Sequence, residues 1–140
     1  MAKINFKSIF DGVSLAVNAA FPDSKVHGGE TSQGVAAGDF NVTLASAEHN
    51  KEVGQRFKRT PLVDVIYYPA NGAADCYDKA DALTLALESI TTPEGDIIHA
   101  TSCNWKVEDD VLHVLLTYDH HIYIPQTHEP METLRIEQEE

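Results

Sequence analysis

The sequence predicts an α+β fold: a mainly antiparallel sheet with two helices packed on one face, in the order α-β-β-β-α-β-β. Two helical patterns are separated by several segments in which apolar and polar residues alternate. Short turn-forming segments join the strands, as in antiparallel hairpins. At 140 residues the chain has the size of one compact domain. We expect residues 1–125 to form it and residues 126–140 to be an acidic C-terminal tail.

The first helix is expected over residues 5–21. Its apolar positions recur at steps of three and four, at Phe6, Ile9, Val13, Val17 and Ala20. Asn5 can cap the start of this helix, and Pro22 ends it. Residues 24–27 then favour a short strand. Four glycines and little periodicity in residues 28–38 indicate a mobile loop.

The next strand is expected over residues 39–48, where polar residues alternate with apolar ones. Residues 49–60 join it to a central strand over residues 61–69. Because this link is longer than the loop of a tight hairpin, we expect it to protrude as an arm or a wide loop. In the central strand, Val63, Val65 and Tyr67 share one face.

A turn at Asn71-Gly72 precedes the second helix. Its apolar stripe comprises Cys76, Ala80, Leu83, Leu87 and Ile90. We expect this stripe to pack on the central strand. The aspartates at positions 75, 78 and 81 complement the positive end of the helix dipole.

After a turn over residues 91–96, strand segments are expected over residues 97–100 and 102–107, followed by a strand over residues 111–124. Cys103 and Trp105 share a face with Val107, which favours the core. The 111–124 strand is expected to be the longest, with a bend or bulge near Asp119. Cys76 and Cys103 form no Cys-x-x-Cys pair, and we expect both to be buried small apolar residues. The tail, with five glutamates against one arginine, is either disordered or a short strand that pairs with a neighbouring subunit.

A net charge of −12 argues against non-specific nucleic-acid binding. No apolar run approaches the roughly 20 residues that cross a bilayer, and no signal peptide is evident, so we expect a cytoplasmic protein. Yet four of the ten basic residues, at positions 51, 56, 58 and 59, lie within nine positions. This segment indicates a self-complementary surface or one that meets acidic partners, the alternative being an ordinary solvated loop.

Catalytic patterns are sparse. His120 and His121 are adjacent on a strand and therefore point to opposite faces. A site that combines His113, Asp119 and His121 remains one alternative. Neither cysteine has an activating context, and no glycine-rich phosphate loop occurs. We therefore expect no catalytic, cofactor-binding or metal-binding residue. Interfaces and cores both favour the aromatic residues Phe57, Tyr67, Tyr68, Tyr118 and Tyr123.

Four passages together resemble the tail terminator proteins of tailed phages and prophages of Gram-positive bacteria. They are Ile4-Asn-Phe-Lys-Ser-Ile-Phe10, Arg56-Phe-Lys-Arg-Thr-Pro-Leu-Val-Asp-Val-Ile-Tyr-Tyr-Pro69, Cys76-Tyr-Asp-Lys-Ala-Asp-Ala-Leu83, and Trp105 with Tyr118-Asp-His-His-Ile-Tyr123. The resemblance covers residues 5–125. It implies a non-enzymatic α+β subunit that forms, commonly as a six-membered ring, on the end of a finished tail tube.

Such a ring would stop tube polymerisation and present the surface for the head-tail connector. The implied partners are other copies of the chain, the tail tube protein and the connector, with no membrane, cofactor or sequence-specific nucleic acid. The implied location is the host cytoplasm during assembly and then the virion tail. The expected subunit interface comprises Lys51, Arg56, Phe57, Lys58 and Arg59. Arg56 and Arg59 are expected to contact the neighbouring subunit, and the 28–38 loop is a candidate to face the lumen or tube.

Two alternatives remain. One is another neck, tail-completion or minor tail protein of the same assembly. The other is a small metal-dependent hydrolase that uses His113 or His121.

Overall fold

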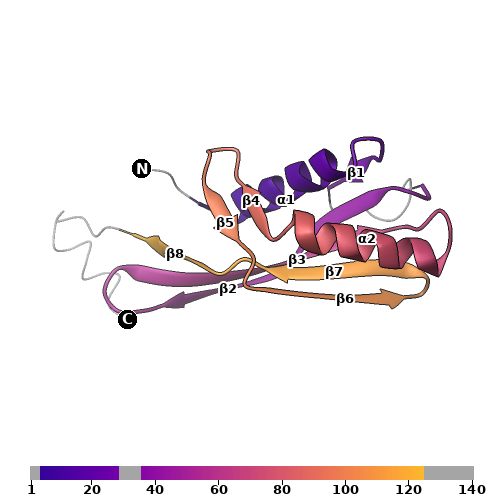
Figure 1. Cartoon of the computed structure of the whole chain (residues 1–140). Coiled ribbons are helices and arrows are strands. Elements are labelled where there is room, and N and C mark those ends of the chain that lie inside the picture. Colours follow the sequence, from indigo (N-terminus) through magenta and orange to yellow (C-terminus); the bar gives the residue numbers. More distant parts are fainter. Residues whose placement is uncertain (1–3, 29–35, 125–140) are drawn as a thin grey trace.

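The computed structural model describes residues 4–28 and 36–124, which form two helices on one face of a mostly antiparallel sheet (Figure 1). This is the predicted α+β class and order. The helices are α1 (Phe6–Ala20) and α2 (Ala73–Ala86). The main sheet contains β1 (Val26–His27), β2 (Phe40–Lys51), β3 (Arg56–Tyr67), β6 (Ser102–Glu108), β7 (Val111–Thr117) and β8 (His120–Tyr123). A separate two-stranded sheet pairs β4 (Ser89–Thr91) with β5 (Ile97–His99).

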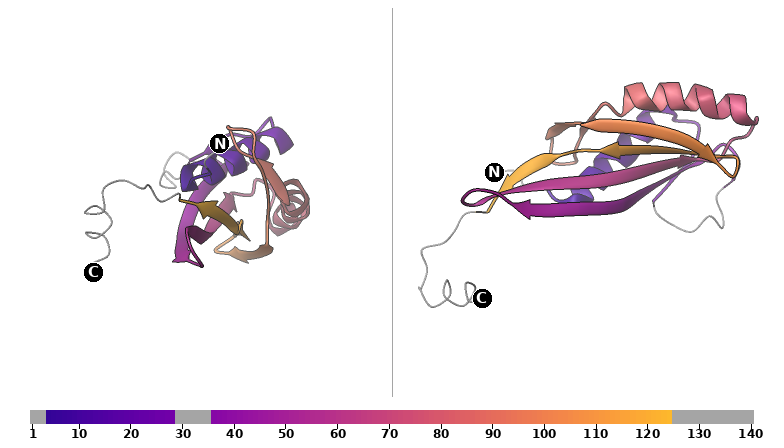
Figure 2. Two further views of the ribbon diagram at one scale, coloured as in Figure 1. Left: turned by 90° about the vertical axis from the view of Figure 1, so that its left-hand side faces the viewer. Right: turned by 90° about the horizontal axis from the view of Figure 1, so that it is seen from below.

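The main sheet runs in the order β1-β2-β3-β7-β6, with β8 also paired to β3. Only β1 is parallel to its neighbour; the other pairs are antiparallel. Figure 2 shows the long β2 and β3 side by side along the whole sheet, with α1 behind them in the right-hand view. With 12 residues each, β2 and β3 are the longest described strands, so the prediction for residues 111–124 was wrong.

A proline explains why the 111–124 segment divides into β7 and β8. Pro61 of β3 stands opposite Tyr118, where its carbonyl accepts the Tyr118 N–H at 3.3 Å. Proline has no N–H to return, so the ladder loses one hydrogen bond at this point. The free carbonyl of Tyr118 instead accepts from His120 Nδ1 at 2.9 Å. The break confirms the bend predicted near Asp119.

The core lies between the sheet and the two helices. Val63, Val65 and Tyr67 are buried on the helix side of β3, as predicted. The buried hydrophobic residues contributed by α1 are Ile9, Val13 and Val17, and those contributed by α2 are Cys76, Ala80 and Leu83. Ile90, predicted on the helical stripe, is also buried but belongs to β4, because α2 ends at Ala86.

The start of α1 has the predicted cap. The Asn5 side chain accepts from the Ser8 N–H at 2.8 Å, and the Ser8 hydroxyl accepts from the Asn5 N–H at 3.4 Å. Gly12, in the middle of this helix, lets β4 approach closely. A Cβ there would lie 3.1 Å from Ile90 Cδ1 and 3.2 Å from the Thr91 carbonyl oxygen. This contact accounts for a glycine in a helix interior.

Two residues expected in the core lie on the surface instead. Cys103 is exposed, and Trp105 retains 45% of its accessible surface. Both point to the helix side of the sheet, because their β7 partners Leu116 and Val114 are buried. Since β6 is the edge strand, however, the helices cover it only in part. The alternation therefore predicted the correct face but not its exposure.

Two further predictions lie outside the described residues. Most of the 28–38 loop falls in residues 29–35, and the acidic tail falls in residues 125–140.

Candidate functional site

Beyond the helices the sheet continues as an exposed extension, which we call the arm: residues 48–60 together with β8. In it β2 runs out to Lys51 and β3 returns from Arg56, so the link is a hairpin and the alternative of a wide loop was wrong. Three strands form the arm, because β8 pairs with β3 from Arg56 to Arg59. Figure 1 shows this extension at the end of the sheet opposite the turn between β6 and β7.

The pleat of β3 divides the five predicted interface residues between two faces. Phe57 and Arg59 share the helix side with Val63, and Lys51 joins them because it pairs with Phe57. Arg56 and Lys58 point to the opposite side. The cluster that is continuous in sequence therefore forms two smaller groups, one on each face of the arm.

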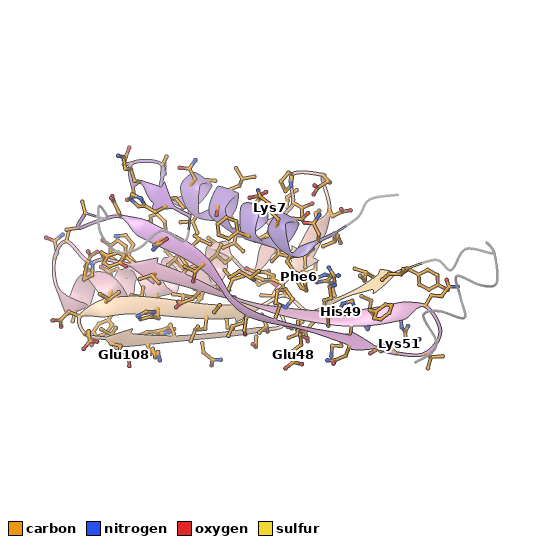
Figure 3. The ribbon with its side chains drawn as sticks, turned by 180° about the vertical axis from the view of Figure 1, so that it is seen from behind. Phe6, Lys7, Glu48, His49, Lys51 and Glu108 are labelled. Carbon is orange, nitrogen blue, oxygen red and sulfur yellow. The ribbon has the colours of Figure 1, made fainter. Side chains whose placement is uncertain are left out.

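On the helix side, Arg59 ties the arm to the start of α1. Its Nε donates to His49 Nδ1 at 2.9 Å, and its guanidinium carbon lies 4.3 Å from the centre of the Phe6 ring. The His49 ring in turn stacks on Phe57 with centroids 4.6 Å apart. Figure 3 shows Phe6 at the end of the helix nearest the arm, with His49 and Lys51 on the adjacent ribbon. Arg59 is thus engaged within its own subunit.

On the opposite side, the basic residues have weak ionic partners. Arg56 Nε lies 3.0 Å from Glu52 Oε1, which also lies 3.2 Å from His121 Nε2. Lys58 Nζ lies 3.6 Å from Asp119 Oδ2. Solvent-exposed pairs of this kind contribute about 0–1 kcal/mol each, so a partner can displace them at little cost.

Near the tip, three exposed side chains are available for contacts. Lys51 is exposed and forms no ion pair among the described residues. Val53 and Tyr123 retain 85% and 65% of their accessible surface. An apolar and aromatic tip beside an unpaired lysine is a composition typical of a protein interface.

At the base of the arm, His120 is held neutral. Burial lowers the pKa of its imidazole, and the nearby charge of Arg59 lowers it further. With Nδ1 donating to the Tyr118 carbonyl, the ring helps to fix the bend between β7 and β8. His120 therefore supports the arm without adding positive charge to it.

The predicted metal-site alternative is not assembled. His113 lies on β7, where Nδ1 contacts Asp64 Oδ2 at 3.0 Å, whereas His121 lies on β8 beside Glu52. Within residues 4–28 and 36–124, no three His, Cys, Asp or Glu side chains are grouped to hold a metal ion. His113 and His121 thus belong to separate two-residue contacts.

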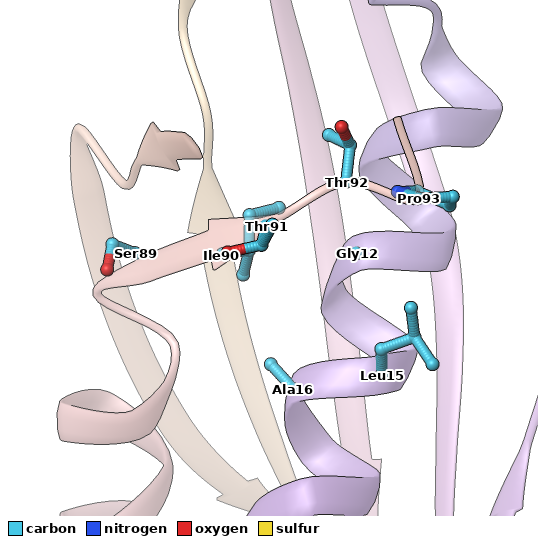
Figure 4. A pocket seen from close by; sticks show the side chains of 8 residues that line it. All are labelled: Gly12, Leu15, Ala16, Ser89, Ile90, Thr91, Thr92 and Pro93. Atoms are coloured by element: carbon cyan, nitrogen blue, oxygen red, sulfur yellow. The ribbon is translucent and has the colours of Figure 1, made fainter. Parts of the chain in front are cut away.

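A groove of about 470 Å³ lies between α1 and β4 (Figure 4). Its lining consists of Gly12, Leu15, Ala16, Ser89, Ile90, Thr91, Thr92 and Pro93. None of these side chains titrates near neutral pH, so the groove has no group for acid-base chemistry. The sequence patterns did not indicate it, because its two walls are far apart in the chain.

A second exposed apolar surface lies along β6. Tyr77 of α2 and Trp105 of β6 retain 54% and 45% of their accessible surface, with ring centroids 6.0 Å apart. Sequence reasoning missed this pair because only the strand order makes β6 an edge. A signal was present, however, since Tyr77 lies off the buried stripe of α2.

Neither described helix has the length and apolar character needed to cross a membrane. A search of curated proteins found no match to the chain. A family model described as "Phage tail terminator protein" does match, over residues 8–130.

Proposed function

The chain belongs to the phage tail terminator family, whose members are structural tail proteins rather than enzymes, and we propose that it caps the tail tube as a hexameric ring. The ring stops tube polymerisation and forms the surface to which the head-tail connector joins. Its partners are other copies of the chain, the tail tube protein and the connector. Assembly takes place in the cytoplasm of a Gram-positive host, and the ring remains in the virion tail.

The arm is the observation that supports ring formation. It carries Lys51, Arg56, Phe57 and Lys58 beyond the helices, with Arg59 packed against Phe6 of α1, on a protein whose net charge is −12. A basic extension that meets acidic surface on the next copy makes a head-to-tail contact, and such contacts close into rings. Within this interface Lys51 and Arg56 contact the neighbouring copy, while Arg59 positions the arm through Phe6.

The molar mass in solution tests ring formation, measured by light scattering at low and high protein concentration and at two salt strengths. We expect a species of about 92 kDa, six copies of the 15.4 kDa chain, that dissociates as salt increases. If the ring forms only on the tube, the chain is monomeric alone and becomes bound to the tube when tail tube protein is added. A monomer under all of these conditions would refute the ring.

Charge reversal tests the arm itself. The double variant Lys51→Glu, Arg56→Glu should shift the hexamer to monomer and leave the melting temperature nearly unchanged, because exposed charges contribute little to folding. Lys7→Glu is the matched control, since Lys7 is an exposed lysine on α1, paired with Asp11 at 2.9 Å. A hexamer that survives the double reversal would exclude the arm from the interface.

Capping is tested by growing tubes from tail tube protein with and without the ring. We expect tube elongation to stop when the ring is added. Binding to the connector without any binding to the tube would instead indicate a neck component.

A further inference from the structure

The sheet has two open edges, and we propose that β6 of one copy pairs with the arm segment of β2 in the next copy. This inference rests on the proposed ring and names the surface that receives the arm. The sheet order β1-β2-β3-β7-β6 leaves the outer side of β6 without a strand partner among the described residues. On the other side, β1 covers only Phe40 and Asn41 of β2, so the rest of that edge is open as well.

The β6 edge has weak protection, since its charged residues Lys106 and Glu108 point away from the helix side. Six of its seven residues are exposed, and the strand has neither a proline nor a bulge. Natural proteins usually shield such edges, because unpaired N–H and C=O groups attract another strand. The exposed rings of Trp105 and Tyr77 add apolar surface along the same edge. An edge with unpaired backbone groups and exposed apolar rings is more stable when it is paired with another strand than when it is exposed to solvent.

The side of α2 next to β6 is acidic. Asp81 lies one turn after Tyr77 on the same side of the helix, and it is exposed. Glu88, also exposed, follows the helix, and its carbonyl accepts the Ala100 N–H at 2.8 Å, close to the start of β6. Neither carboxylate forms an ion pair within the described residues. The β6 edge therefore carries free negative charge on its helix side.

The arm segment of β2 complements this edge. Ala47, His49 and Lys51 point to the helix side, because they pair with Pro61, Arg59 and Phe57. Ala47 is small and leaves room for the Trp105 ring, and Lys51 is exposed without an ion pair. A lysine on one edge and free carboxylates on the other favour pairing between copies of the chain.

The strand directions also agree. Each step across the sheet from β2 to β6 is antiparallel, so β6 runs opposite to β2. Within one sheet β6 lies level with residues 40–46 of β2, so contact with the arm segment requires the next copy to be shifted along the strands. Rotation about an axis to which the strands are tilted, as in a closed barrel, gives such a shift. It also leaves β2 of the second copy antiparallel to β6 of the first copy. The contact between the two sheets is then antiparallel, like the pairs from β2 to β6 within each sheet. Because the two edges differ, the contact repeats head to tail and closes when the rotation allows it.

Matching the two faces limits the register. Cys103 and Trp105 must lie opposite helix-side residues of β2, so Cys103 faces Ala47, His49 or Lys51 of the neighbouring copy. When Cys103 faces His49, Trp105 faces Ala47. Lys51 then comes close to the start of β6, near Glu88. The Cα atoms of antiparallel partners are roughly 4.5–5.5 Å apart, a separation that a disulfide spans.

Cys103 provides the test, since it is an exposed thiol and the other cysteine, Cys76, is buried. We would introduce Ala47→Cys, His49→Cys and Lys51→Cys separately into the full chain and oxidise each assembled sample gently. At least one variant should give a ladder of covalent oligomers up to six on a non-reducing gel. Adding Cys103→Ser should abolish the ladder. Glu48→Cys, on the same strand but the opposite face, is the matched control and should give none.

Parallel light scattering separates the two proposals. A hexamer in which none of the three variants cross-links would overturn the β6–β2 contact and leave the ring intact. A ladder that closes at another number supports the contact and refutes the hexamer. Absence of both oligomer and ladder, with and without tail tube protein, would overturn both.

Discussion

The two halves of β3 share one backbone conformation but play different parts. From Pro61 to Tyr67 alternate side chains are buried, with Val63 and Val65 fully inaccessible, whereas no residue from Arg56 to Thr60 is buried. Both halves pair with β2 on one side and with β7 or β8 on the other. The two halves differ in what covers their helix side. The helices lie over the inner half, from Pro61 to Tyr67, whereas the outer half, from Arg56 to Thr60, contacts α1 through Arg59 and Phe6. Strand pairing alone therefore does not decide which side chains stabilise the fold.

The energetic consequence follows from burial. A buried Val or Leu side chain contributes about 1.5–3 kcal/mol, whereas an exposed ion pair such as Arg56–Glu52 contributes about 0–1 kcal/mol. The inner half thus stabilises the fold, and the outer half retains side chains whose contacts are replaceable. Substitutions in the two halves and their neighbours test this difference between buried and exposed side chains.

The largest effect is expected for Leu116→Ala. Leu116 is fully buried opposite Val63, and its truncation should lower the free energy of unfolding by about 3 kcal/mol. Leu115→Ala, on the uncovered face of the same strand and only half-buried, should cost about 1 kcal/mol. Urea denaturation measures both values. Equal losses would show that the helices do not decide the stability of the inner sheet.

Tyr67→Phe should cost about 1–2 kcal/mol, because a hydrogen bond to a charged group is lost. The Tyr67 hydroxyl donates to Asp75 Oδ2 at 2.6 Å, and only 2% of this residue is exposed. Tyr68→Phe is the control, since the described hydrogen bonds of Tyr68 involve only its backbone. Thermal unfolding of both variants checks the difference, and similar melting temperatures would contradict the prediction.

The same contact predicts a pH dependence. Burial alone raises the pKa of Asp75, but hydrogen bonds from Tyr67 and Lys79 outweigh it and lower the pKa to about 2. Because the folded-state pKa lies below the ordinary value, the stabilisation is complete above pH about 4 and is lost as the pH falls towards about 2. The stability difference between the wild type and Tyr67→Phe should therefore shrink over this range. A difference that stays constant from pH 6 to pH 2 would refute this role of Asp75.

The smallest effects are expected in the arm. Arg59→Ala removes the contacts with His49 and Phe6 and should cost about 0.5–1 kcal/mol, with faster amide hydrogen exchange in the arm. Arg56→Ala, which loses only the pair with Glu52, should change stability by less than about 0.5 kcal/mol. A larger loss of stability for Arg56→Ala than for Arg59→Ala would contradict the conclusion that Arg59, and not Arg56, holds the arm to the rest of the subunit.

Much of the fold was predictable because its signals are local. The helical spacing of Ile9, Val13 and Val17 and the alternation of Val63 and Val65 each arise from one element and its period. The Asn5 cap and the bend near Asp119 also depend on nearby residues. Errors occurred where a residue's exposure depends on distant elements, as for Trp105 on the edge strand.

The candidate interface was also predictable only where its signals are local. A run of basic residues is visible in the chain, so the arm was predictable as a charged segment. Its pairing with β8 was not, because β8 lies more than 60 positions later in the sequence. The separation of Arg56 from Arg59 was missed because residues 49–60 were expected to be a link and not part of a strand. The position of β6 at the edge was not predictable, since an edge exists only once the strand order is set; the one local signal for this surface was Tyr77, off the buried stripe of α2.

The types of most elements, the faces of the strands, the acidic charge and the basic segment follow from the sequence alone. Periodicity and composition carry these properties, and both can be read within short stretches. The folded chain was needed to show which strands lie at the edges, which faces the helices cover, and that Arg59 contacts residues of its own subunit. These outcomes depend on contacts between residues far apart in the chain, and no local pattern encodes them.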